Sequence, residues 1–338
     1  SAKQATGTLR RFAQQMAGGL VAPAAALLVA AISGWGQLLV ALPAVLAWAA
    51  APLVAQRVSA RLEPVELLAD KGDLAELRLV ARRTWGFFET FVTADQLHLP
   101  PDNFQEDPEP RIAHRTSPTN IGLYFLTVIS ARDFGWIGDC ETVDRLQATM
   151  ASARNLEHQH GHLYNWYDTE TGKPLSPRYV SSVDSGNYVG HLLVLASFCR
   201  EWRENPPTPV DPRNGLADGV GLLEQVVSEL PEKRWTGCDR AGAQAHVGAI
   251  RQGFATLVAG PLTIQSLTAF GVKVGELVGV GGLPGTLRHV AQSLARSVSS
   301  ALRDLALDDE GRRELVDRLA VVEAQAREEF RSTDFDFV

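Results

Sequence analysis

The chain has 338 residues, with 32 Lys and Arg against 39 Asp and Glu, so its formal net charge at pH 7 is −7. This acidic balance, together with the lack of any run of basic residues, argues against nucleic-acid binding. The three cysteines, Cys140, Cys199 and Cys238, are an odd number without a CxxC pair. They fit a reducing compartment and argue against a disulfide-stabilised fold. The first residue is Ser1 rather than methionine, which indicates a fragment or a processed chain.

Residues 12–56 contain no charged side chain, a run far too long for the apolar part of a signal peptide. The run divides at Ser33–Gly36 into two apolar arms, 18–32 and 37–55. Each arm is near the lower limit for a membrane span, about 17 to 20 residues. We therefore predict a membrane-spanning helical hairpin over residues 1–62. A buried, alanine-rich hairpin of a soluble protein is the alternative.

Basic residues flank the predicted hairpin on both sides. Lys3, Arg10 and Arg11 precede it, and Arg57 and Arg61 follow it. Since positive charge is retained on the cytoplasmic side of a membrane, both ends of the hairpin are predicted to lie in the cytoplasm.

A charged segment with Pro64 and Gly72 predicts a linker at 63–73, followed by a helical domain over 74–338. Apolar periodicity and cap signals predict helices at about 74–91, 118–134, 141–157, 188–202, 216–230, 241–258, 263–277, 286–305 and 311–330. No strand-like alternation of useful length appears. The fold class is therefore all-α. Helices in succession, with long loops at every second connection, are the layout expected of a toroid of helical hairpins that opens its inner loops onto one cleft.

The stretch from His162 to His191 concentrates the residue types that bind polyhydroxylated ligands. It begins with aromatic residues, passes through a Gly/Pro-containing turn at 171–174, and ends with the polar run 181–187 before an apolar helix. Sugar rings stack on flat aromatic faces, and short polar side chains bond their hydroxyls. A helix cap by Ser185 or Asp184 is the structural alternative, and Trp166 and Tyr167 serve equally well as core residues.

A proline-rich loop at 97–114 carries Asp102 and Asn103 and is a plausible wall of the same site. Arg115 either holds ligand hydroxyls or forms a structural ion pair with Asp102. The full predicted substrate-binding set is Asp102, Asn103, Arg115, Asn120, Trp166, Tyr167, Asp184 and Asn187. His158, His160 and His162 do not share a helical face and lack further ligands nearby, so we predict a polar loop there and no metal.

Six blocks of the sequence resemble cyclic β-1,2-glucan synthases. They are RRTWGFFETF (82–91), LPPDNFQED (99–107), HRTSPTNIGLY (114–124), DFGWI (133–137), LYNWYD (163–168) and YVSSVDSGNYVGH (179–191). Their order and their Trp, Pro and Asp content make the resemblance specific over about Leu79 to Trp202.

The resemblance implies the last membrane helices and the N-terminal part of the cyclisation domain of a large, multi-pass protein of the bacterial inner membrane, with the soluble domain in the cytoplasm. That domain is an (α/α)6 toroid similar to glucoamylase-like proteins, and it would be incomplete here. It acts as a transglycosylase that closes a linear β-1,2-glucan into a ring. The partners implied are the β-1,2-glucan chain, membrane lipid, and the glycosyltransferase and phosphorylase-like domains of the same synthase.

The same resemblance limits what is assigned to this chain. The UDP-glucose site belongs to an earlier domain, so no cofactor is expected in this segment. The catalytic acid and nucleophile are expected beyond Val338, which would leave this chain inactive by itself. Two alternatives stay open: a hydrolytic β-1,2-glucanase-like glycoside hydrolase, and a truncated, non-catalytic glycan-binding membrane fragment.

Overall fold

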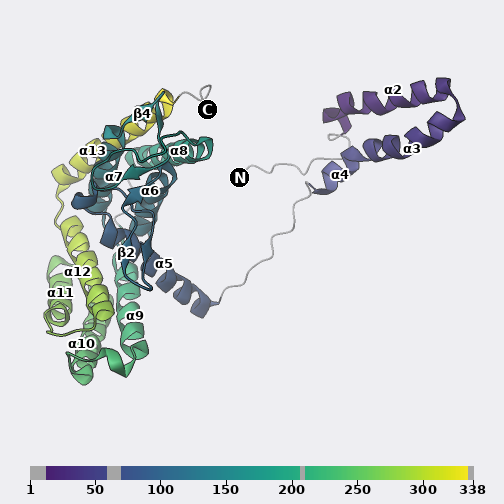
Figure 1. Ribbon diagram of the computed structural model, residues 1–338. Coiled ribbons are helices and arrows are strands. Elements are labelled where there is room, and N and C mark those ends of the chain that lie inside the picture. Colours follow the sequence, from purple (N-terminus) through teal and green to yellow (C-terminus); the bar gives the residue numbers. More distant parts are fainter. Residues whose placement is uncertain (1–12, 59–69, 206–209, 334–338) are drawn as a thin grey trace. The chain divides into compact units, whose positions relative to one another are not determined.

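The computed structural model describes residues 13–58, 70–205 and 210–333. The chain divides into two compact units, Ser1–Ala69 and Asp70–Val338 (Figure 1). Some predicted features fall outside the described residues: the basic residues Lys3, Arg10, Arg11 and Arg61, and positions 63–69 of the predicted linker. The boundaries of the linker and of the two predicted domains stay predictions.

The first unit is a helical hairpin, as predicted. Helix α2 (Ala17–Ser33) packs beside α3 (Trp35–Ala49), and α4 (Ala51–Val58) continues from α3. The turn between the arms is made by Gly34, whose φ of 115° lies in the region that favours glycine. Within the described residues, one helix is long and apolar enough to cross a membrane, Trp35–Val58, whereas the apolar helix Pro23–Ser33 is shorter.

The second unit contains helices at all nine predicted positions, and the structure is 72% helical, which confirms the all-α fold class. Its helices are α5 (Lys71–Phe91), α6 (Pro118–Asp133), α7 (Asp139–Asn155), α8 (Ser182–Glu204), α9 (Arg213–Glu229), α10 (Arg240–Ala259), α11 (Ile264–Val278), α12 (Gly285–Leu305) and α13 (Asp309–Ser332). Two single turns of 3-10 helix, Ala94–Gln96 and Glu232–Arg234, lie in the loops. Helix α5 begins three residues earlier than predicted because Asp70 and Asp73 cap each other's backbone N–H groups.

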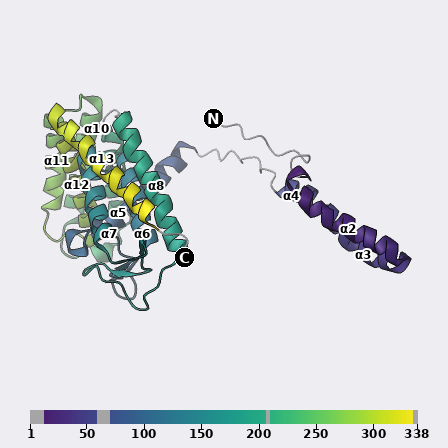
Figure 2. The same ribbon diagram turned by 90° about the horizontal axis from the view of Figure 1, so that it is seen from above.

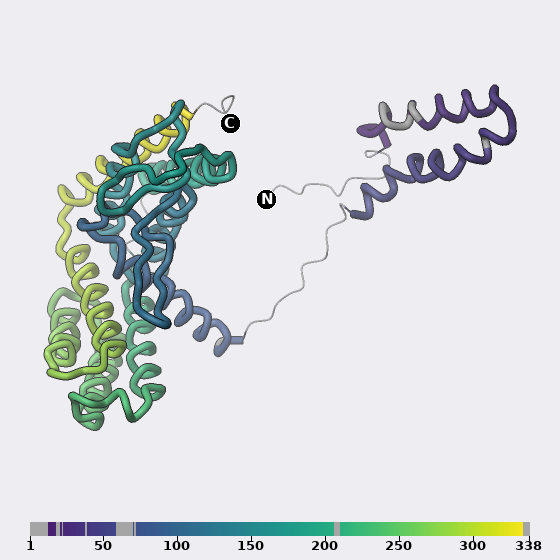
Figure 3. The backbone as a smooth tube through the Cα atoms, in the orientation of Figure 1, coloured from purple at the N-terminus to yellow at the C-terminus, as the bar shows by residue number. Residues whose placement is uncertain are grey.

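Eight of the helices in the described part of the second unit form two groups, each around its own apolar core. Helices α6, α7, α8 and α13 enclose one core, and α9 to α12 enclose the other. Figure 3 shows the last helix, in yellow, returning to the first group after the second group is complete, and Figure 2 shows α13 lying against α8. Helix α5 contacts α9 and α6 and so touches both groups. The (α/α)6 arrangement stays a prediction.

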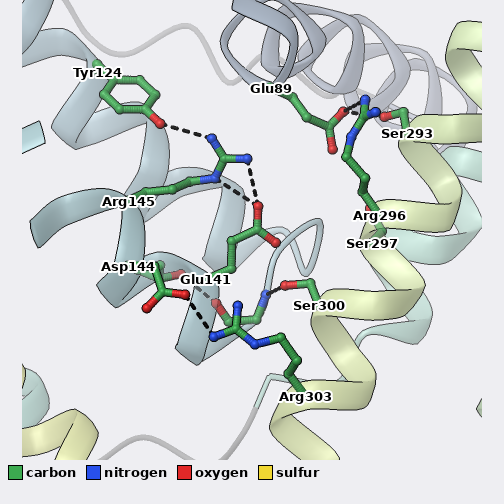
Figure 4. A network of polar contacts seen from close by, with 12 residues as sticks. Glu89, Tyr124, Glu141, Asp144, Arg145, Ser293, Arg296, Ser297, Ser300 and Arg303 are labelled. Carbon is green, nitrogen blue, oxygen red and sulfur yellow. Dashed lines mark hydrogen bonds and ion pairs between the residues drawn. The ribbon is translucent and has the colours of Figure 1, made fainter. Parts of the chain in front are cut away.

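Polar contacts from α12 join the two groups. Ser300 (Figure 4) accepts a hydrogen bond from the backbone N–H of Gly138 at 2.9 Å. Asp304 accepts from the N–H groups of Asp139 and Cys140 at the start of α7. These N–H groups have no partner within their own helix, so α12 supplies the cap that the sequence before α7 lacks. A carboxylate at this end also complements the helix dipole.

In the part of the chain that the structure describes, three pairs of two-residue antiparallel strands fold the long loops. They are β1 (Phe104–Gln105) with β2 (Arg111–Ile112), β3 (Arg115–Thr116) with β6 (Tyr167–Asp168), and β4 (His158–Gln159) with β5 (His162–Leu163). Strands of two residues are too short to show an alternating pattern, so they could not be predicted from the sequence.

His158 anchors the β4–β5 hairpin to α13. Its Nε2 lies 2.7 Å from a carboxylate oxygen of Glu329, and its Nδ1 lies 2.7 Å from the carbonyl oxygen of Leu156. Both ring nitrogens face acceptors, so the protonated ring satisfies both contacts. Burial by itself would lower the pKa of His158, but the hydrogen bond and charge of Glu329 and the Leu156 carbonyl outweigh burial and raise this pKa above its ordinary value.

A histidine whose pKa is higher in the folded than in the unfolded state stabilises the fold below its unfolded pKa, about 6.5, and this contribution disappears as the pH rises through the folded pKa. We expect His158→Ala to lower the free energy of unfolding at pH 6, by up to about 1.5–3 kcal/mol for a hydrogen bond to a charged group. The loss should be smaller at pH 9. Urea unfolding at both pH values measures it, with His246→Ala in α10 as the control. An equal loss at the two pH values would contradict the charged pair.

Candidate functional site

Two helix N-termini define the floor of the candidate site. Ser117 caps α6 by accepting from the N–H of Asn120 at 3.2 Å, with Pro118 in the first turn as predicted. Ser181 caps α8 by accepting from the N–H of Asp184 at 3.2 Å. Helix α8 therefore begins at Ser182, six residues before the predicted start. The expectation that Ser185 caps this helix is wrong, because Ser181 supplies the cap and Ser185 is buried one turn inside.

Because α8 starts early, Asp184 and Asn187 lie in its first two turns and face the start of α6. The Thr119 hydroxyl donates to Asp184 Oδ1 at 2.6 Å, and the amide of Asn187 donates to Thr119 Oγ1 at 3.2 Å. Asn165, which is buried, completes the contact when its amide is oriented to satisfy its neighbours. Its nitrogen then donates to Asp184 Oδ2 at 2.9 Å. Both carboxylate oxygens of Asp184 are thus occupied.

The proline-rich loop contributes the second carboxylate. Asp102 Oδ2 accepts from Arg115 at 2.9 and 3.2 Å and from the Asn103 amide at 3.0 Å. Its other oxygen lies 3.5 Å from the Asn120 amide nitrogen. Arg115 thus forms the structural ion pair with Asp102, one of the two roles that the sequence left open. With half of its side chain exposed, it can also reach a ligand.

The β3–β6 pair places Arg115 beside the aromatic residues. Its register aligns Arg115 with Asp168 and Thr116 with Tyr167, and the Arg115 guanidinium lies over the ring of Trp166, 4.7 Å from its centroid. In the satisfied orientation, the Asn165 amide oxygen accepts from Trp166 Nε1 at 2.5 Å. Trp166 therefore connects the Arg115–Asp102 pair to Asp184.

Tyr167 is a core residue and not a stacking platform, the two roles that the sequence left open. Its ring is fully buried, and its hydroxyl donates to the carbonyl of Glu157 at 2.6 Å and accepts from the N–H of Tyr164 at 2.7 Å. Burial raises the pKa of Tyr167 well above its ordinary range. The ring therefore offers no face for stacking on a sugar.

Seven of the eight predicted residues therefore form one connected polar surface, and Tyr167 lies beneath it. Thr119 and Asn165 are the residues that join its parts, and neither was in the predicted set. The only sequence signal for Asn165 is its position as an amide between aromatic residues in the 163–168 block. Asn103 and Arg115 also line an open depression of about 970 Å³ around the β1–β2 hairpin.

The arrangement can bind hydroxyl groups through carboxylate oxygens, amides and a guanidinium. Two carboxylates could serve glycoside chemistry, but here the oxygens of Asp102 and Asp184 are engaged by neighbours, which suits orienting groups better than a nucleophile or acid. Among the residues that the structure describes, no group of three or more His, Cys, Asp or Glu side chains is arranged to hold a metal ion.

Comparison with known proteins agrees with the resemblance inferred from the six blocks. The chain is 50% identical over 220 residues to the cyclic β-(1,2)-glucan synthase NdvB of Rhizobium meliloti (strain 1021). The match covers 64% of this chain and 8% of that synthase, so the chain spans a small part of the relative's length. No protein-family model matches the sequence. The chain is thus similar to one segment of a cyclic β-(1,2)-glucan synthase.

Proposed function

We propose that the chain is a segment of a cyclic β-1,2-glucan synthase and that its second unit binds the glucan during cyclisation. The observation that carries the binding role is the connected surface that joins the 97–103 loop, the N-termini of α6 and α8, and Trp166. The similarity to the synthase supplies the identity of the sugar chain. The reaction proposed is transglycosylation, in which one end of a linear β-1,2-glucan is joined to the other.

The residues of the surface have separate roles in this proposal. Trp166 provides the apolar face for a glucose ring, and Arg115 and Asn187 donate hydrogen bonds to hydroxyls. Asp102 and Asp184 hold these donors in place. Glycoside transfer also needs a carboxylic acid and a nucleophile at a defined separation. We assign that pair to other parts of the synthase, and we propose that α6 and α8 are inner helices of an (α/α)6 toroid.

The membrane hairpin fits the same proposal. A membrane association is supported by the apolar helix Trp35–Val58 and by the relative. We further propose a multi-pass inner-membrane protein whose second unit lies in the cytoplasm, where the glycosyltransferase and phosphorylase-like domains would be its partners.

An alkaline carbonate wash of membranes tests the hairpin. We expect the chain to stay in the membrane pellet because a charge-free segment of this length, 12–56, binds strongly to the hydrocarbon core. A reporter fused at Val338 should give a cytoplasmic signal. Release into the supernatant would contradict membrane insertion, and a periplasmic signal would reverse the topology.

The glucan-binding role is tested by Asp184→Asn in the complete synthase. This change removes the charge that accepts from Thr119 and Asn165, and a hydrogen bond to a charged group is worth about 1.5–3 kcal/mol. We expect cyclic product to fall about tenfold or more while chain elongation from UDP-glucose persists. Product is measured as glucan that resists an exo-acting β-glucosidase, which cannot attack rings.

Glu201→Gln, an exposed position near the end of the same helix, is the matched control and should leave both activities unchanged. The 338-residue chain alone, incubated with linear glucan, should give no resistant product. Normal ring formation by Asp184→Asn would contradict the role of the surface. Resistant product from the chain alone would show that a carboxylate of this segment is catalytic.

A further inference from the structure

A second cleft lies between α5, α9, α12 and the β1–β2 hairpin, apart from the surface described above. Its volume is about 1030 Å³, which is in the range of small-molecule sites. Its walls are apolar. They include the aromatic residues Phe87, Phe91 and Phe104 and the aliphatic residues Leu222, Val226 and Leu294. The rings of Phe91 and Phe104 are in contact, with centroids 4.8 Å apart. The walls therefore favour an apolar or aromatic ligand body.

The cleft has a buried guanidinium among its lining residues. Arg82 is 2% exposed, and its Nη2 donates to the hydroxyl of Ser293, which in turn donates to Glu89. Its Nη1 lies 3.5 Å from Glu89. Its Nε is buried and has no hydrogen-bond partner among the described residues. A buried donor left unpaired costs free energy, and the Arg82 side chain as a whole lines the cleft.

The charged side chains at the base of the cleft carry one more positive than negative charge. Arg296 lies 3.2 Å from the same Glu89 carboxylate (Figure 4). Together with Arg82, two guanidiniums therefore share one anion. The nearby Asp218 is occupied by Arg78 at 2.7 Å. His289 also lines the cleft, where burial and the charge of Arg296 lower its pKa and keep the ring neutral at pH 7. At the exposed mouth, Arg83 and Glu229 are 3.9 Å apart and Glu106 is exposed to solvent, where water screens their charges.

We propose that this cleft binds a small molecule that carries a carboxylate on an aromatic or alkyl body. The body lies against the Phe87, Phe91 and Phe104 rings, and the carboxylate lies toward Arg82 and Ser293, where it balances the second guanidinium. Charge-assisted bonds from a guanidinium to a carboxylate are among the stronger polar contacts in proteins. This inference does not depend on the glucan proposal, because the two sites use different residues.

Calorimetric titration of the full chain in nanodiscs of zwitterionic lipid tests the site. The probe is 4-phenylbutyrate, and 4-phenylbutan-1-ol is the neutral comparator with the same body. We expect saturable binding of the carboxylate, at least about tenfold tighter than that of the alcohol. Equal affinities, or no saturable binding of the carboxylate, would overturn the proposal.

Glycine positions allow the cleft to be filled without removing the buried charges. A Cβ atom at Gly86 would meet only His289 Nε2, at 3.8 Å, and a Cβ atom at Gly285 would meet nothing within 4 Å; both glycines line the cleft. We expect Gly86→Leu and Gly285→Leu each to weaken 4-phenylbutyrate binding about tenfold or more. Gly248→Leu, an exposed helical glycine away from the cleft, should bind as the parent chain does. Unchanged binding by both cleft variants would place the ligand elsewhere and overturn the assignment.

Discussion

The candidate site depends on how closely α6 and α8 approach each other. A side chain at Gly122 in α6 would clash with the ring of His191 in α8, since its Cβ would lie 2.3 Å from Nδ1. Only glycine permits this distance. One turn nearer the N-terminus of α6, the same approach brings the Thr119 hydroxyl within 2.6 Å of Asp184. The packing of two buried helix faces thus determines where the polar ends of both helices lie.

The apolar pattern of the sequence was sufficient to predict the helices but not all of their ends. Helix α8 was placed too late because its first two turns contain Gly186 and polar residues, which resemble a loop. The Ser181 cap and the contacts with α6 nevertheless stabilise these turns. Similarly, α7 has no side-chain cap of its own and takes one from Asp304, more than 100 residues away in the chain. A cap from such a distance has no local signal.

The composition of the site was easier to predict than its connections. Loops rich in Asp, Asn, Trp and Arg predicted segments that the structure brings together, and binding residues are often carried by loops that a rigid scaffold positions. Tyr167 could not be separated from Trp166 by sequence, since both are aromatic and adjacent, and the β3–β6 pair that includes Tyr167 is too short to show an alternating pattern. The second cleft was not predicted, because its lining comes from three helices and a hairpin that lie far apart in the sequence. Phe104 and Pro110 line both this cleft and the depression beside Arg115. The β1–β2 hairpin therefore borders both the cleft and the depression.

The most direct test of the central claim is the affinity of the 338-residue chain for linear β-1,2-glucan, measured by calorimetry with Thr119→Val. This change keeps the side-chain volume but removes the hydroxyl that joins α6 to Asp184. Thr127→Val, farther along the same helix, where the hydroxyl bonds only the carbonyl of Leu123, is the control. Our account predicts saturable binding by the parent chain and by Thr127→Val, and affinity about tenfold or more weaker for Thr119→Val. Equal affinity for all three chains, or no binding by the parent chain, would contradict it.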